Sequence, residues 1–118
     1  MPKRISKISR RAPRKESAAP SLPYEPLLIV RLKDAAEAAA YLEAVLEEGD
    51  QAAIMLALRQ IAQAQGGVAE IARKAKLTRE ATYKMLSKSG NPELRSLSAV
   101  LKATGLRIAV KPIEKRAA

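Results

Sequence analysis

Residues 71–86 read Ile-Ala-Arg-Lys-Ala-Lys-Leu-Thr-Arg-Glu-Ala-Thr-Tyr-Lys-Met-Leu, and this stretch is the most informative part of the sequence for fold class. Its spacing fits two short helices joined by a tight turn. Ala72 is small where the second helix would cross the first, and Thr78 is a good N-cap for the second helix. The apolar side chains that would fix the crossing angle are those of Ala75, Leu77, Met85 and Leu86. The pattern predicts a helix-turn-helix.

Two positions in this stretch depart from the usual pattern. Lys76 stands at the turn position where Gly is usual, so we expect a non-glycine residue in the left-handed conformation. Thr82 stands where an aliphatic residue is usual, so its hydroxyl needs a hydrogen-bond partner. The alternative interpretation is an ordinary pair of solvated amphipathic helices.

The outward side chains of the second helix predict a DNA-reading surface. In this motif the N-terminal part of the second helix enters the major groove, while the first helix spans the backbone. Arg79 can donate two hydrogen bonds to a guanine edge, whereas Lys84 and Lys88 suit phosphate. Tyr83 suits either sugar-phosphate or a thymine methyl group. The complete predicted set is Lys74, Thr78, Arg79, Glu80, Tyr83, Lys84, Ser87, Lys88 and Asn91.

Charge alternates along the chain, from basic to acidic to basic. Residues 1–33 carry nine Lys and Arg against two Glu, and residues 68–118 carry twelve against four. Residues 34–67 carry one Arg, at position 59, against six acidic residues. Either basic block can neutralise phosphates, and the acidic block cannot. The acidic block is therefore a solvated helix face or a surface that meets a basic protein.

The remaining pattern predicts a mostly α domain of five helices with short flanking strands. Asp34, with Glu37 as capping-box partner, and Asp50 begin the first two helices, which end at Gly49 and at Gly66-Gly67. The other three cover 68–75, 78 to about 88, and 94–104. A short apolar run with β-branched residues predicts a strand at 27–32, and alternation predicts one at 106–111. The predicted organisation is a disordered basic arm at 1–26, a strand or linker at 27–33, the helical domain at 34–113 and a tail at 114–118.

Composition excludes several classes of protein. The chain of 118 residues has neither Cys nor His, so it has no disulfide, no Cys/His zinc site and no nucleophile that needs either residue. We expect no catalytic residues, no cofactor and no bound metal. The absence of an apolar run of about 18 residues predicts no membrane association and a cytoplasmic protein. With the predicted DNA-binding surface, we expect it to be nucleoid-associated.

From about Ala38 to Pro112 the chain resembles the addiction-module antidote proteins, HigA-like antitoxins with an Xre/Cro-type helix-turn-helix. The resemblance implies a five-helix, lambda-repressor-like domain that represses its own operon and neutralises a small basic toxin of the RelE/ParE type. Residues 78–80, 83 and 84 fall where the family reads DNA. The basic arm and the run at 27–32 are not typical of it. The resembling stretches are residues 41–50, 71–73, 77–80, 83–86, 90–92 and 97–108.

Two other functions stay open from the sequence. One is a free-standing Xre-type regulator without a toxin, and the other is an RNA-binding or ribosome-associated basic protein. For the DNA-binding reading we expect a homodimer on a palindromic operator, with half-sites about 34 Å apart. A core rich in alanine and a lone terminal strand both favour dimerisation, with residues 106–111 as part of the contact.

Overall fold

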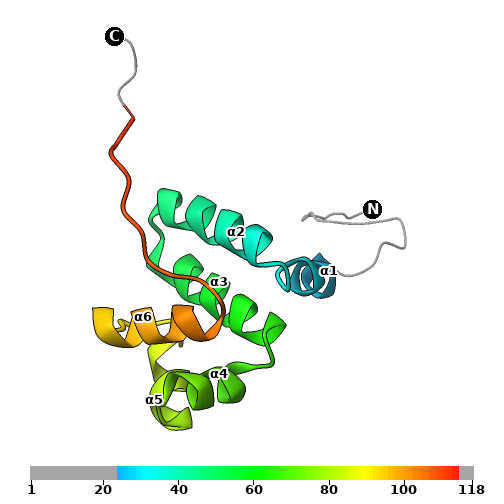
Figure 1. Cartoon of the computed structure of the whole chain (residues 1–118), viewed down its shortest axis with the longest axis vertical. Helices are drawn as coiled ribbons and strands as arrows, with labels where there is room; N and C mark the ends of the chain where they lie inside the picture. The colour runs from blue at the N-terminus through cyan, green and yellow to red at the C-terminus, as the bar shows by residue number, and fades with distance from the viewer. Residues whose placement is uncertain (1–23, 115–118) are drawn as a thin grey trace, which may run out of the picture.

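The computed structural model describes residues 24–114, and it contains six helices in that range (Figure 1). The mostly α class is confirmed, whereas the predictions of five helices and of flanking strands are wrong. Residues 1–23 of the predicted arm and residues 115–118 of the tail lie outside the described part. Within 24–114, no helix is long and apolar enough to cross a membrane. The helices are α1 Tyr24–Arg31, α2 Ala35–Glu48, α3 Gln51–Ala64, α4 Val68–Ala75, α5 Arg79–Met85 and α6 Leu94–Ala103.

Local capping signals place α2 and α3 where the sequence predicts them. The Asp34 carboxylate accepts a hydrogen bond from the Ala36 amide at 2.9 Å, and Asp50 does the same for Ala52 at 3.2 Å. Gly49 ends α2 in the left-handed conformation, with φ of 77°. The capping-box prediction is wrong, because the Glu37 carboxylate instead accepts from the Arg31 guanidinium at 3.1 Å.

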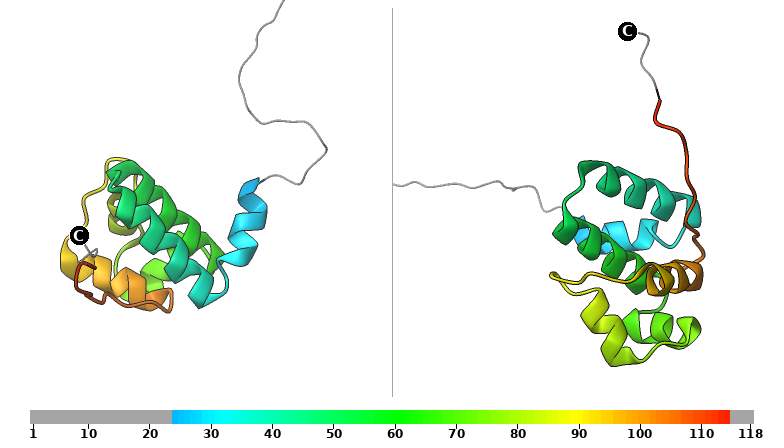
Figure 2. Two further views of the ribbon diagram at one scale, coloured as in Figure 1. Left: turned by 90° about the horizontal axis from the view of Figure 1, so that it is seen from above. Right: turned by 90° about the vertical axis from the view of Figure 1, so that its left-hand side faces the viewer.

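The predicted strand at 27–32 is helical: residues 27–31 belong to α1 and Leu32 lies in the turn after it. Leu28 and Leu32, four residues apart, are buried on one side, whereas Val30 is 61% exposed. Over six residues an apolar run does not distinguish a strand from a helix, so its contacts decide. Here the decisive contact is with α3, whose end α1 crosses at a steep angle (Figure 2).

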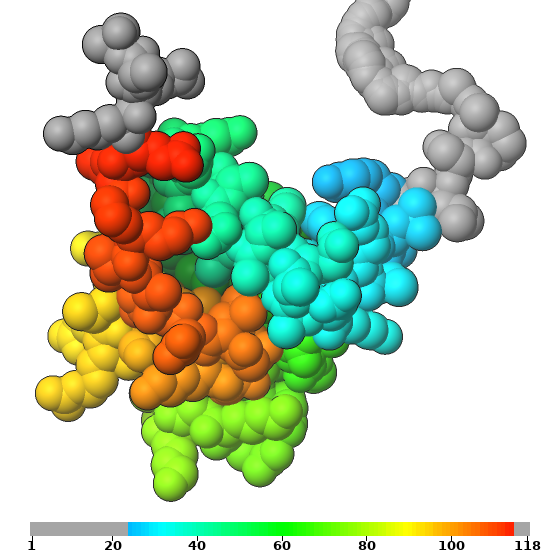
Figure 3. All heavy atoms as spheres, turned by 45° about the horizontal axis from the view of Figure 1, so that its top comes forward, coloured from blue at the N-terminus to red at the C-terminus, as the bar shows by residue number. Residues whose placement is uncertain are grey.

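The predicted strand at 106–111 is extended chain without a strand partner. The Leu106 amide donates to the Leu101 carbonyl at 2.9 Å, and the chain then runs alongside α2 (Figure 3). Lys111 reaches Glu43 of α2 at 3.5 Å. The alternating pattern correctly indicates extended backbone, but a ladder needs a second strand, and the only other predicted strand is helical.

Helix α3 is the centre of the core. It contacts α1, α2 and α4, and α6 packs against α4. A smaller buried cluster of Ala62, Ile71 and Val100 joins α3, α4 and α6. Because Ala62 and Ala72 are fully buried and small, the helices approach closely around the helix-turn-helix. The buried residues of α3 are Met55, Ala57, Leu58, Gln60, Ile61, Ala62 and Ala64.

Candidate nucleic-acid interface

Helices α4 and α5 form the predicted helix-turn-helix. Lys76 ends α4 in the left-handed conformation, with φ of 62° and ψ of 41°, so the prediction for this residue is confirmed. The Leu77 amide then donates to the Ala72 carbonyl at 2.9 Å, which closes a Schellman-type turn. Ala72 is fully buried, in keeping with its predicted place at the crossing of the two helices.

Both Thr78, the N-cap of α5, and Thr82, within that helix, have local hydrogen-bond partners for their hydroxyl groups. The Thr78 hydroxyl accepts a hydrogen bond from the Ala81 amide at 3.0 Å, so the predicted N-cap is confirmed. Thr82 is fully buried, and its hydroxyl donates to the Thr78 carbonyl at 2.8 Å. The hydroxyl thus finds its partner one turn back in the same helix, which explains how a polar residue is accommodated at an apolar position.

The predicted end of this helix is wrong, because α5 stops at Met85 and not near Lys88. The Ser87 amide and the Ser87 hydroxyl both donate to the Lys84 carbonyl, at 3.2 and 2.7 Å. This turn takes up the carbonyl that would continue the helical ladder, so the chain leaves the helix axis. Ser87, Lys88 and Asn91 therefore lie on the loop between α5 and α6.

The nine predicted DNA-binding residues run from the last turn of α4, through the turn and α5, to the loop before α6. All are exposed except Ser87, which is half-buried. Within α5, Glu80 and Lys84 lie opposite the buried Thr82 by helical periodicity, so they occupy the middle of the outward face. Tyr83 is 50% exposed and lines a hollow beside α3. The order of the outward face is therefore Tyr83 on the α3 side, then Glu80 and Lys84.

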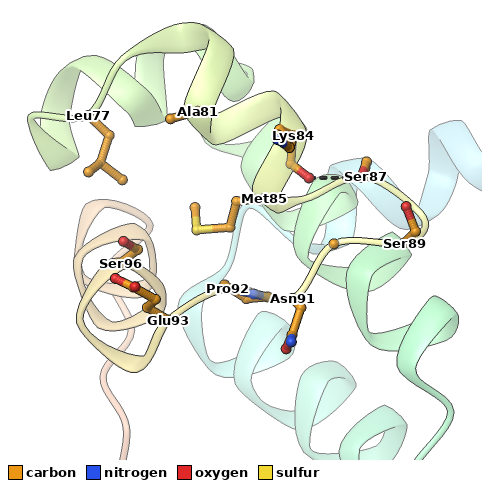
Figure 4. Close-up of a pocket in the computed structure, with 11 residues that line it drawn as sticks. Leu77, Ala81, Lys84, Met85, Ser87, Ser89, Asn91, Pro92, Glu93 and Ser96 are labelled. Carbon is orange, nitrogen blue, oxygen red and sulfur yellow. Dashed lines mark hydrogen bonds between the residues drawn. The ribbon is translucent and has the colours of Figure 1, made fainter.

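A second hollow, of about 450 Å³, lies on the other side of α5, between that helix, the following loop and the start of α6 (Figure 4). Met85 and Leu77 contribute its apolar surface, and Lys84 stands at its edge. Small polar side chains of the loop complete the rim, so the hollow combines an apolar floor with hydrogen-bonding groups. These loop residues are Ser87, Ser89 and Asn91.

Two side chains of α3 bond to the end of α5 and to the loop after it, and neither was predicted from the sequence. The Arg59 guanidinium donates to the Leu86 carbonyl, and the Gln51 amide donates to the Gly90 carbonyl at 2.9 Å. Both bonds join residues far apart in the sequence. The one available signal was that Arg59 is the sole cation of residues 34–67.

Arg73 is engaged within α4. Its guanidinium donates to the Glu70 carboxylate, Nε to Oε1 at 3.0 Å, and this hydrogen bond holds the pKa of Glu70 below its ordinary value. The neighbouring Lys74, by contrast, is in the predicted set and is exposed. Among residues 24–114, no group of three or more acidic side chains is placed to hold a metal ion.

Comparison with known proteins identifies the family. Residues 28–112 match the family described as probable addiction module antidote protein. The chain belongs to this family. It is also 39% identical over 71 residues to an uncharacterized protein of Haemophilus influenzae, an alignment that covers 60% of this chain and 72% of the relative. No solved structure matches the chain.

The acidic surface of this antidote-family protein lies on α2 and the start of α3. Glu37 is paired with Arg31 and Glu43 with Lys111, and Asp50 caps α3. Glu47 and Glu48 are exposed in the last turn of α2, where the helix dipole disfavours negative charge. Two glutamates at this end weaken the helix slightly and leave a concentrated negative charge on the surface.

Proposed function

We propose that this protein is the antitoxin of a type II toxin-antitoxin module. It binds a palindromic operator as a homodimer, represses its own operon, and neutralises a small basic RelE/ParE-like toxin by direct binding. Membership in the antidote family supports the antitoxin role. The observation that carries the DNA-binding part is the α4–α5 pair, with its left-handed Lys76 turn and the exposed residues of α5.

The outward face of α5 suits double-stranded DNA. Arg79, in the first turn, can donate a pair of hydrogen bonds to guanine, and Glu80 can accept from the amino group of cytosine. Lys84 and Lys88 add phosphate contacts on the side of the loop. The serine hydroxyls and the asparagine amide that line the hollow beside Lys84 can donate hydrogen bonds to phosphates of the same DNA strand. In this proposal the first turn of α5 reads bases, and its last turn and the following loop position the duplex.

The toxin-binding part of the proposal rests on the negative charge of α2 and on the position of that helix away from α5. Figure 1 places α2 at the opposite end of the helical body from α5. A basic partner on the Glu47–Glu48 surface would therefore leave α5 free, so that DNA and toxin can be held together. Charge complementarity of this kind chiefly raises the rate of association and sets its salt dependence.

The experiment that tests DNA binding is fluorescence anisotropy with the upstream promoter of the protein's own gene. A scrambled duplex of the same composition runs beside it at two salt concentrations. We expect about a hundredfold preference or more for the promoter, because specific DNA-binding proteins favour their own site over non-specific DNA by about a thousandfold or more. Equal and steeply salt-dependent binding to both duplexes would contradict the operator role and favour a general nucleic-acid or RNA-binding role.

The toxin-binding part is tested by co-purification with a small basic protein encoded in the same operon. Glu47→Lys should slow formation of the complex and flatten its salt dependence, whereas Glu93→Lys, at the start of α6, should not. Absence of any such complex would leave a free-standing regulator as the function.

A further inference from the structure

The last described segment of the chain, residues 106–114, is extended but unpaired. After the Leu106 amide, no backbone hydrogen bond joins this segment to any other residue in the range 24–114. Its apolar side chains become more exposed along its length, from 43% at Ile108 to 92% at both Val110 and Ile113. An extended edge with exposed β-branched residues is a template for pairing with another strand.

The segment is nevertheless held in place against α2. Leu106 packs on the core, and Ile108 faces a groove of about 260 Å³ that Leu42 and Leu46 of α2 also line. Farther along, Lys111 is paired with Glu43 at 3.5 Å. These contacts anchor one side of the segment and leave its outer edge accessible (Figure 3). The edge is thus positioned for pairing before any partner arrives.

We propose that residues 106–114 of two copies pair as an antiparallel two-stranded sheet, with Val110 on the two-fold axis. This inference rests on the proposed function in one respect: binding to a palindromic operator requires a dimer. Because the axis maps each strand onto the other, one residue must lie opposite its own copy. Only a few registers are therefore possible, and the charged residues of this segment distinguish between them.

Charge excludes the neighbouring registers. An axis at Ala109 would place Arg107 opposite Lys111 twice, and an axis at Lys111 would place two lysines opposite each other. Like charges directly opposite destabilise a ladder. An axis at Ile108 would end the pairing at Val110 and leave Ile113 uncovered.

The register centred on Val110 avoids these conflicts. Lys111 then lies opposite Ala109, and Arg107 lies opposite Ile113 of the second copy. Two valines face each other where the segment is most exposed, which removes β-branched apolar surface from water.

Pro112 fits the same register. Antiparallel residue pairs alternate between hydrogen-bonded and non-hydrogen-bonded sites. If the Val110 pair is non-hydrogen-bonded, Pro112 opposite Ile108 is non-hydrogen-bonded too, because it lies two residues away. Proline has no amide hydrogen, so a non-bonded site is where a ladder tolerates it. The hydrogen-bonded sites then fall to residues 107, 109, 111 and 113, which all have amide hydrogens.

The test is a scan of single cysteines, which the absence of native Cys makes clean. Opposed residues in an antiparallel pair have α-carbons about 4.5–5.5 Å apart, within the range that a disulfide spans. Each residue away from the axis separates the two copies by about 7 Å more along the strands. Val110→Cys should therefore cross-link under mild oxidation about tenfold faster than Ile108→Cys or Lys111→Cys. Leu94→Cys, which is 71% exposed on α6, is the collision control.

The scan is run on the full chain without DNA or toxin, so its result is independent of the promoter-binding measurement. Sedimentation of the cysteine-free chain accompanies it, with Val110→Asp expected to raise the dimer dissociation constant at least about tenfold. Val30→Asp, on the exposed side of α1, is the matched control and should leave dimerisation unchanged. Three results would each overturn the proposal. These are faster cross-linking at another position than at Val110→Cys, equally fast cross-linking at Leu94→Cys, and normal dimerisation of the Val110→Asp chain.

Discussion

Gly90 lies so close to Met85 that a β-carbon built on it would be 1.9 Å from the Met85 carbonyl oxygen. The loop after α5 therefore turns back directly over the end of that helix. The Gly90 amide donates to Ser87, and its carbonyl accepts from Gln51 of α3. Both the amide and the carbonyl of Gly90 are thus hydrogen-bonded, and the loop has little freedom to move away from the end of α5.

Gly90→Ala should lower the free energy of unfolding by about 2–4 kcal/mol, because an added methyl group would force the backbone of the loop away from α5. Urea denaturation measures the effect. Ser89→Ala, at the exposed neighbouring position, serves as control and should change stability by less than about 0.5 kcal/mol. A Gly90→Ala protein as stable as the control would mean that the loop yields easily.

Lys76→Gly should stabilise the protein by about 0.5–1 kcal/mol. A residue with a β-carbon in the left-handed conformation costs about 1–2 kcal/mol, and glycine removes that cost while adding entropy to the unfolded chain. Lys102→Gly, within α6, should have the opposite sign, about 0.5–1 kcal/mol less stable. Thermal and urea unfolding measure the stability of both variants. If both substitutions changed the free energy of unfolding in the same direction, backbone strain would not be the main effect at Lys76.

Thr82→Val should change stability by less than about 1 kcal/mol, because the Thr78 carbonyl still accepts from the Thr82 amide at 3.0 Å when the hydroxyl is gone. Thr82→Ser keeps the hydroxyl but removes a fully buried methyl group, and should cost about 1 kcal/mol. Denaturant titration of the two variants ranks them. The reverse order would show that the hydroxyl contributes more than packing at this position.

Features that depend on neighbouring residues could be predicted from the sequence, and features that depend on distant residues could not. Caps such as Thr78 and the Lys76 turn depend on neighbours within a few residues, so α2 to α6 and the helix-turn-helix could be predicted. Helix α1 could not, because a run of six residues, five of them apolar, fits either period until α3 is known to lie beneath it. The hydrogen bonds from Arg59 to the end of α5 and from Gln51 to the following loop join residues 27 and 39 positions apart, which no local pattern reveals.

Docking of α1 should weaken at high pH through Tyr41. Its hydroxyl donates to Gln60 at 2.6 Å, and Gln60 in turn donates to Glu25 of α1 at 2.9 Å. Burial, and then the nearby Tyr24 and Glu25, raise the pKa of Tyr41 above its ordinary value of 10.0. The unfolded chain therefore loses this proton first, so the contribution is fully present below about pH 10 and is lost as pH rises further.

Urea denaturation between about pH 8 and pH 11 measures this loss. Tyr41→Phe should cost about 1 kcal/mol at neutral pH and should show a smaller decline at high pH than the unaltered chain. Tyr83→Phe, an exposed tyrosine elsewhere, should follow the unaltered chain. Parallel curves for all three proteins would rule out Tyr41 as a source of the pH dependence.

Arg79→Ala and Lys88→Ala should separate base reading from phosphate binding. Arg79 begins α5, and under the proposed function its guanidinium contacts a base edge, so its loss should cost about 1–3 kcal/mol on the promoter and relax base preference. Lys88 lies on the loop, so its loss should weaken promoter and scrambled duplexes alike and reduce the salt slope by about one. Lys102→Ala removes an exposed cation of α6 outside the predicted set, and its binding should match that of the unaltered chain. If Arg79→Ala lost affinity equally for every duplex, Arg79 would be a phosphate contact, and base reading would have to come from Glu80 and its neighbours.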